Sequence, residues 1–143
     1  MALDKEPMKV STALKLAKEY YSKSGYDHAM RVAGYVAENM SIPPEYRDEC
    51  ICLAIMHDLI EDTDFKLASY YPENFSKALL LLTKPKEMPY VDYCKKLRCV
   101  DYSNYRMCAY WVKLADMKDH LSLKDTLTDK LKQKYLEGLA ELL

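Results

Sequence analysis

The stretch ICLAIMHDLIEDTD, residues 51–64, decides the fold class and the chemistry that the chain can support. Its first six residues, 51–56, are apolar on every side of a helix, which predicts a central helix that is buried all round. The polar residues that follow are His57-Asp58 and, one helical turn further on, Glu61-Asp62. Three carboxylates crowded beside one imidazole repel one another unless a cation or basic side chains compensate their charge.

Helical periodicity also dominates the rest of the 143 residues. The length suits one domain, and neither a repeat nor a long linker divides it, so we expect residues 1–143 to form a single compact all-α domain of about seven or eight helices. The expected helices cover residues 10–22, 27–40, 45–60, 63–71, 72–83, 90–98, 104–121 and 123–142, with a break at Ser24-Gly25, a loop at 84–89 and a turn at 101–103.

The composition excludes several classes of function. With 21 basic and 22 acidic residues the net charge is −1, so nothing attracts nucleic acid or an anionic membrane over long range. Only 3 Gly are present, which excludes glycine-rich phosphate loops. No apolar run approaches the roughly 18 residues of a membrane span, and the N-terminus has no signal-peptide segment. The 5 Cys, an odd number without a CxxC pair, predict reduced, mostly buried thiols in a cytoplasmic protein.

Two further residues complete a candidate metal site with His57 and Asp58. His28 begins the expected second helix, and Asp116 lies late in another strongly apolar helix. Two imidazoles and two carboxylates suit one borderline or hard divalent ion, such as Mn²⁺, Fe²⁺ or Zn²⁺, with positions left open for water and substrate. A dinuclear centre needs more imidazole ligands, and only His120 remains, so we expect a single ion.

On these residues the chain resembles the HD-domain phosphohydrolases, whose pattern H…HD…D is matched at His28, His57-Asp58 and Asp116. It is more closely similar to the hydrolase domain of RelA/SpoT-type proteins and its small stand-alone relatives. The similar segments are HAMRVA at 28–33, AIMHDLIEDTD at 54–64, LLTKPKEMPYVDY at 81–93 and VKLADMKDHL at 112–121. The resemblance implies an HD-domain fold and the metal-dependent conversion of guanosine tetra- or pentaphosphate to GDP or GTP plus pyrophosphate, with Mn²⁺ as the expected ion.

The same hypothesis gives roles to the remaining polar residues. Glu61 and Asp62 are the expected catalytic pair, positioning or deprotonating the attacking water; the alternative is a solvated acidic helix end. Lys84, Lys86 and Lys23 are the expected partners of the pyrophosphate, and the alternative for Lys84 and Lys86 is a solvated loop.

His120 stands where the resembling family usually has Asn. It is either a contact of the metal ligands or of the substrate, or a surface residue. The expected partner of the whole protein is a small nucleotide. Two alternatives remain open: a phosphatase for another nucleotide or phosphorylated metabolite, and a catalytically silent module that senses a nucleotide.

Overall fold

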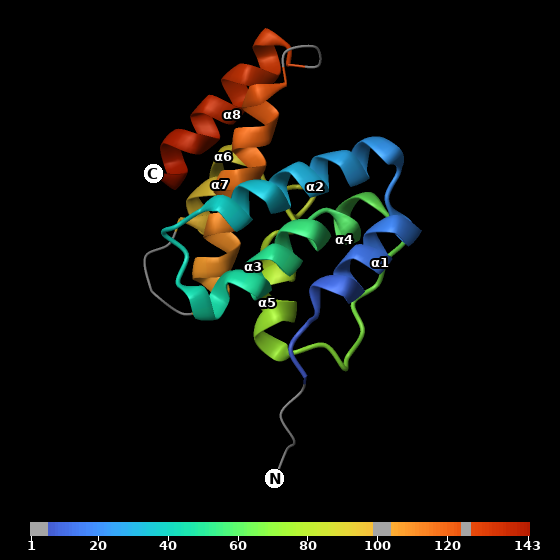
Figure 1. Cartoon of the computed structure of the whole chain (residues 1–143). Coiled ribbons are helices and arrows are strands. Elements are labelled where there is room, and N and C mark those ends of the chain that lie inside the picture. Colours follow the sequence, from blue (N-terminus) through green and yellow to red (C-terminus); the bar gives the residue numbers. More distant parts are fainter. Residues whose placement is uncertain (1–5, 99–103, 124–126) are drawn as a thin grey trace.

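α-Helices are the only regular elements in the parts of the chain that the structure describes, residues 6–98, 104–123 and 127–143. Within these ranges the computed structural model has seven helices of at least eight residues and one four-residue helix, so the predicted all-α fold is confirmed (Figure 1). The helices are α1 (Val10–Tyr20), α2 (Lys23–Glu38), α3 (Pro44–Met56), α4 (Leu59–Asp62), α5 (Glu73–Leu81), α6 (Tyr90–Leu97), α7 (Asn104–Ser122) and α8 (Asp129–Leu142).

Helix α3 lies at the centre of the fold, as its apolar sequence predicts. It contacts α1, α2, α5 and α7, and Leu53, Ala54 and Met56 are completely buried. Burying a leucine side chain such as that of Leu53 stabilises the fold by about 1.5–3 kcal/mol. Helix α7 in turn contacts α2, α3, α5, α6 and α8. The three helices α2, α3 and α7 therefore pack against one another, and these helices carry the predicted ligands.

The start of α2 differs from the prediction. The sequence analysis places a break at Ser24-Gly25 and a helix start at Asp27, whereas α1 ends at Tyr20 and α2 already begins at Lys23. The side-chain oxygen of Ser22 accepts the backbone N–H of Gly25 at 3.2 Å. This cap satisfies one of the free N–H groups of the first turn, so the helix starts before the glycine instead of after it.

The predicted helix over residues 45–60 is two elements in the structure. Helix α3 ends at Met56, and α4 restarts at Leu59. Between them Asp58 has φ −101° and ψ 0°, which is outside the α-helical region. The break occurs at the most polar point of the sequence, His57-Asp58.

Two other helix predictions need correction. Residues 63–71 contain no helix, because Thr63 donates its hydroxyl to the Leu59 carbonyl at 2.5 Å and accepts the Phe65 N–H at 3.1 Å. The Phe65 N–H is therefore not available to the Glu61 carbonyl, which a continuing helix needs. The predicted start of the last helix at residue 123 is also wrong: α8 begins at Asp129, after its cap Thr128. The predicted turn at 101–103 lies outside the described residues.

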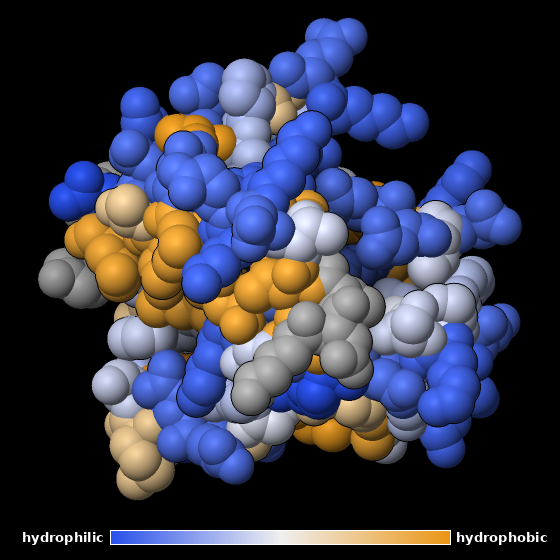
Figure 2. All heavy atoms as spheres, turned by 90° about the horizontal axis from the view of Figure 1, so that it is seen from above, coloured by the Kyte–Doolittle hydropathy of each residue, from blue (hydrophilic) through white to orange (hydrophobic). Residues whose placement is uncertain are grey.

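The four described cysteines are free and buried, as predicted, and Cys99 lies outside the described residues. None of the described helices has the length and apolar character that crossing a membrane requires. Seen from above, hydrophilic side chains surround a group of hydrophobic ones (Figure 2).

Candidate metal centre

Four side chains from three packed helices meet at one point. Helix α2 contributes His28, the end of α3 contributes His57 with the adjacent Asp58, and α7 contributes Asp116. One ligand atom from each lies within 4.8 Å of every other, and this group could hold a metal ion. Metal–ligand bonds of about 2.0–2.2 Å place opposite ligands about 4.0–4.4 Å apart, so the four atoms need to move little to bind one ion.

Individual distances between these atoms also fit a shared ion. Asp116 Oδ1 lies 2.8 Å from His28 Nε2 and 3.1 Å from His57 Nε2. Asp58 Oδ2 lies 3.2 Å from His57 Nε2 and 3.6 Å from His28 Nε2. Both imidazoles therefore direct Nε2 toward the carboxylates and keep Nδ1 for other partners.

The break between α3 and α4 orients His57. Its Nδ1 donates to the backbone carbonyl of Ala54 at 2.6 Å. That carbonyl is free for this bond because the N–H of Asp58, its partner in a regular helix, instead donates to the Tyr21 hydroxyl at 3.2 Å. Tyr21 in turn donates to the Ile55 carbonyl at 2.8 Å. A tyrosine of the α1–α2 connection thus satisfies the backbone at the point where the ligand pair interrupts the helix.

His28 is oriented by a second carboxylate that the sequence analysis missed. Its Nδ1 donates to Asp119 Oδ2 at 2.6 Å, and Asp119 Oδ1 accepts from Arg31 Nε at 2.7 Å. Burial would raise the pKa of Asp119, but the hydrogen bond from Arg31 and the bond from His28 hold it below its usual value. Asp119 therefore stays ionised and fixes the tautomer of His28, as outer partners of metal-bound histidines do.

The other oxygen of Asp116 is held by a buried lysine. Lys113 Nζ donates to Asp116 Oδ2 at 2.9 Å and lies 5.0 Å and 5.4 Å above the rings of Tyr90 and Tyr93. Burial alone would lower the pKa of Lys113, but the charge of Asp116 raises it well above its ordinary value. Asp116 thus uses Oδ2 for Lys113 and presents Oδ1 to the imidazoles.

The hydrogen bonds of His57 show why the donor set fits a cation. The Ala54 carbonyl can only accept, so Nδ1 of His57 carries a proton. In the neutral imidazole, Nε2 then directs a lone pair at two carboxylate oxygens, 3.1 Å and 3.2 Å away. Acceptors this close need either a second proton or a shared cation between them.

Without an ion, the neighbouring carboxylates favour the protonated form of His57. Burial would lower the pKa of His57, but the charge of Asp58 and the hydrogen bond to Asp116 raise it well above its ordinary value. The pKa of Asp116 is held well below the usual range: burial opposes this, and the Lys113 charge and the imidazole bonds outweigh burial. A bound divalent ion would replace that proton.

Beside the four residues lies a cavity of about 280 Å³. Its lining joins His57, Asp58 and Asp116 to the predicted catalytic pair Glu61 and Asp62. The rest of the lining supplies aromatic and basic groups and one leucine: Leu82, Lys84, Tyr90, Tyr93, Lys113, His120, Lys134 and Tyr135. Both side chains are exposed at the edge of the cavity, where partial desolvation and then the neighbouring charge of Asp58 raise the pKa of Glu61 and Asp62. Carboxylates with a raised pKa are stronger bases than ordinary ones.

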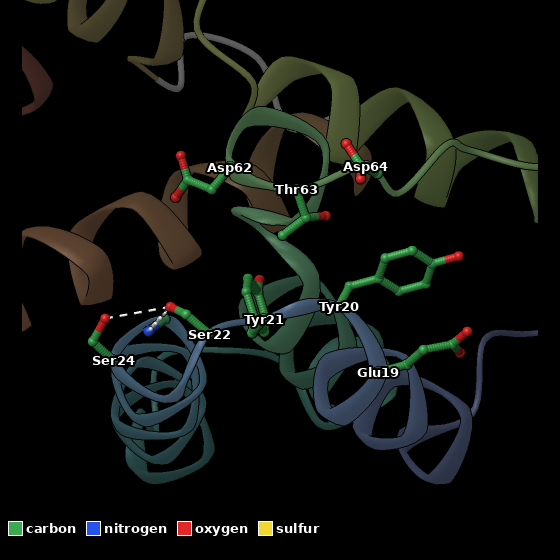
Figure 3. A pocket seen from close by; sticks show the side chains of 9 residues that line it. Glu19, Tyr20, Tyr21, Ser22, Ser24, Asp62, Thr63 and Asp64 are labelled. Carbon is green, nitrogen blue, oxygen red and sulfur yellow. Dashed lines mark hydrogen bonds between the residues drawn. The ribbon is translucent and has the colours of Figure 1, made fainter.

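A second hollow, of about 660 Å³, lies on the other side of Asp62. Asp62 and Asp64 line it from one wall, and Glu19, Tyr21 and Ser22 lie on the opposite wall (Figure 3). The described residues that line this hollow include carboxylates and no basic side chain. Phosphate is therefore better accommodated in the smaller cavity, where three lysines are present.

The structure treats the three predicted phosphate-binding lysines differently. Lys84 lines the cavity and donates to the backbone carbonyls of Pro85 and Met88, both at 3.0 Å. Lys86 is exposed on the same loop and is not part of the lining. Lys23 is 90% exposed and pairs with Asp27 at 3.2 Å, so it is also away from the cavity.

His120 is part of the cavity lining and half-buried. Its Nε2 lies 3.3 Å from Asp116 Oδ1, and its ring stacks on Tyr135 of α8. The sequence analysis did not identify the cavity residues Tyr90, Tyr93 and Tyr135. Helical spacing could have identified Lys113, because it lies one turn before Asp116 on the same helix. It gives no indication of Tyr90, Tyr93 and Tyr135, which lie on the other helices α6 and α8.

The chain matches no family model, and no curated protein gives a significant match. An assignment of function therefore depends on the geometry of this centre.

Proposed function

We propose that this protein is an HD-type, metal-dependent phosphohydrolase that removes pyrophosphate from the 3′ position of guanosine tetra- or pentaphosphate. The observation that supports it best is the convergence of His28, His57, Asp58 and Asp116 from three helices beside a cavity that holds both lysines and free carboxylates. The sequence motifs around these residues support the guanosine substrate. Mn²⁺ is the proposed ion, with Fe²⁺ and Zn²⁺ as the other suitable ions, and the cytoplasm is the proposed compartment.

The four ligands would hold the ion in a polar pocket whose outer groups are already satisfied. When bound, a divalent ion supplies Lewis acidity toward a phosphoryl oxygen and lowers the pKa of water. Lys113 and Asp119 keep Asp116 and His28 in the orientation that binding needs. Because these outer partners are made by the fold itself, little reorganisation accompanies binding.

The carboxylates of Glu61 and Asp62 would handle the proton of the attacking water. Both line the cavity, and neither is needed as a ligand. Hydrolysis consumes one water and breaks the bond between the 3′ oxygen and the pyrophosphoryl group. The tetraphosphate gives GDP and pyrophosphate, and the 3′ oxygen takes up a proton as it leaves. The proton lost by the water passes to a carboxylate whose pKa is raised.

Basic and phenolic groups of the cavity would bind the pyrophosphate. Lys84 and Lys134 bring positive charge to the lining, and ammonium groups bind phosphate as point charges. Tyr90, Tyr93 and Tyr135 contribute the phenolic groups of this lining.

A nucleotide panel tests the proposal. Purified protein with added Mn²⁺ is given guanosine 3′-diphosphate 5′-diphosphate and a set of nucleoside monophosphates, and both orthophosphate and pyrophosphate are measured. We expect pyrophosphate and GDP from the guanosine substrate. His57→Ala and Asp58→Ala should lose both metal and activity, because each removes one of four ligands.

Other outcomes would assign the protein differently. Orthophosphate from a monophosphate, without pyrophosphate release from the guanosine substrate, indicates a phosphatase for other nucleotides. Tight binding of the guanosine substrate without turnover indicates a sensing module. Full metal content in both alanine variants would refute the ligand assignment.

A further inference from the structure

Three imidazoles, and not only two, face the same carboxylate oxygen. The Nε2 atoms of His28, His57 and His120 lie 2.8, 3.1 and 3.3 Å from Asp116 Oδ1. Around an ion with bonds of about 2.1 Å, neighbouring ligands are about 3.0 Å apart in an octahedron and about 3.4 Å apart in a tetrahedron. The three separations are close to that range. From this geometry we infer that His120 is a fifth protein ligand of the ion.

Hydrogen bonding alone does not explain the arrangement. Oδ1 of Asp116 has two lone pairs, and the two imidazoles of His28 and His57 already occupy its surroundings. A third N–H donor on this oxygen exceeds that capacity. An ion shared by the oxygen and the three nitrogens accounts for all of them.

The position of His120 is fixed by packing on both α2 and α8. Its ring lies 4.5 Å from the Tyr135 ring with an angle of 9° between the planes, and 4.6 Å from the His28 ring with an angle of 35°. The side chain of His120 is 30% exposed, compared with 11% for His28 and 4% for His57. His120 therefore binds from the solvent side, where the cavity opens.

The inference deepens the proposed function and rests on its metal centre. Compared with the four-residue centre, a third nitrogen donor moves the preference away from Mn²⁺, the first ion of the proposed function, and toward Fe²⁺ and Zn²⁺, its other two ions, and toward Co²⁺ and Ni²⁺. Five protein ligands also leave one open position on a six-coordinate ion, where four ligands leave two. His120 thus sets both the choice of ion and the room left for water and substrate.

Titration of the full-length protein with Co²⁺ tests this role without using activity. Co²⁺ absorbs visible light, and its band moves to longer wavelength when water oxygen, a weaker-field ligand, replaces imidazole nitrogen. We expect His120→Ala and His120→Phe to shift the band and to weaken Co²⁺ binding roughly 10- to 100-fold, the range seen when even an outer partner of a ligand is lost. Mn²⁺ affinity should fall less, because Mn²⁺ gains less from imidazole.

The phenylalanine variant separates ligation from packing, since it keeps a ring to stack on Tyr135 and removes both nitrogens. A Tyr135→Phe control keeps the stack and the ligand, so its Co²⁺ spectrum should match that of the unaltered protein. An unchanged spectrum and affinity in both His120 variants would overturn the fifth ligand and leave the four-residue centre intact. If the unaltered protein binds no Co²⁺, the metal centre of the proposed function fails, and the fifth ligand fails with it.

Discussion

Each buried imidazole of the centre divides its two nitrogens between the protein and the site. His57 Nδ1 donates a hydrogen bond to the Ala54 carbonyl, and His28 Nδ1 donates one to Asp119. Both Nε2 atoms then face Asp116 Oδ1. The outer hydrogen bonds thereby select the tautomer that a divalent ion requires.

Glu61 and Asp62 are expected to act on the water and not on the ion. Replacing each with its amide, Glu61→Gln and Asp62→Asn, keeps the size and removes the base. We expect each change to lower kcat by about 10²- to 10⁴-fold, with metal content and melting temperature nearly unchanged. Steady-state kinetics and elemental analysis of the purified variants measure these quantities.

Asp64→Asn is the matched control, because Asp64 is exposed and lines only the second hollow. Its kcat should stay that of the unaltered protein. Loss of the ion from either test variant would make that residue a ligand. Normal kcat in both would return Glu61 and Asp62 to the alternative of a solvated acidic helix end.

Sequence spacing predicts the four converging residues because each lies at the polar end of an apolar helix. It misses Asp119, which meets His28 across 91 positions of sequence. Residues on different helices have no fixed spacing, so only packing between α2 and α7 brings this pair together. The same holds for the lysines. The sequence does not indicate whether a basic side chain such as that of Lys23 points toward the cavity or into solvent.

At the scale of elements, α8 completes the cavity by packing closely on α6 and α7. The close approach occurs at Gly138, where an added Cβ would lie 2.6 Å from Tyr90 Cε2 and 2.9 Å from both Cys94 Sγ and Met117 Cε. The glycine therefore lets α8 place Tyr135 and Lys134 beside the site.

Gly138→Ala should lower the free energy of unfolding by about 1–3 kcal/mol, because the new methyl overfills a packed contact. Gly34→Ala is the matched control: a Cβ at Gly34, also within a helix, meets no atom within 4 Å. That change should stabilise the protein by up to about 1 kcal/mol through the higher helix propensity of alanine. Urea denaturation measures the free energy of unfolding of both variants. Equal values for the two would contradict the close-packing argument.

Helix existence follows from the sequence more readily than helix ends. The all-round apolar character of residues 51–56 correctly predicts a central helix, because such a surface must be covered on every side. The break at Asp58 depends on the Tyr21 hydroxyl, which comes from a connection 37 positions earlier. The predicted helix at 63–71 fails because the Thr63 side chain competes for the local hydrogen bonds.

At the scale of the whole molecule, the centre ties three helices together at their polar ends. Helix α7 is far from α2 and α3 in sequence, and the three helices pack against one another (Figure 1). An ion bound only to the folded form stabilises it by mass action, by about 2.7 kcal/mol when its concentration is 100 times Kd. The centre therefore links metal content to global stability, and the two buried histidines make that link depend on pH.

The metal-free protein should lose stability as pH rises above the ordinary histidine pKa of 6.5. Burial would lower the pKa of His28 and of His57, but Asp116 raises that of His28, and Asp58 and Asp116 raise that of His57. The folded form therefore binds protons that the unfolded chain has released. The contribution is complete below pH 6.5 and disappears as pH passes the raised values.

Ion binding needs neutral imidazoles, so stabilisation by added Co²⁺ should grow over the same interval. Melting temperatures measured from about pH 6 to 9, a range around the ordinary histidine pKa, test both pH dependences. One series contains a chelator and the other contains Co²⁺. His57→Gln should make both dependences of melting temperature on pH weaker. Melting-temperature curves that run parallel with and without the ion would show that these histidines do not couple metal binding to folding.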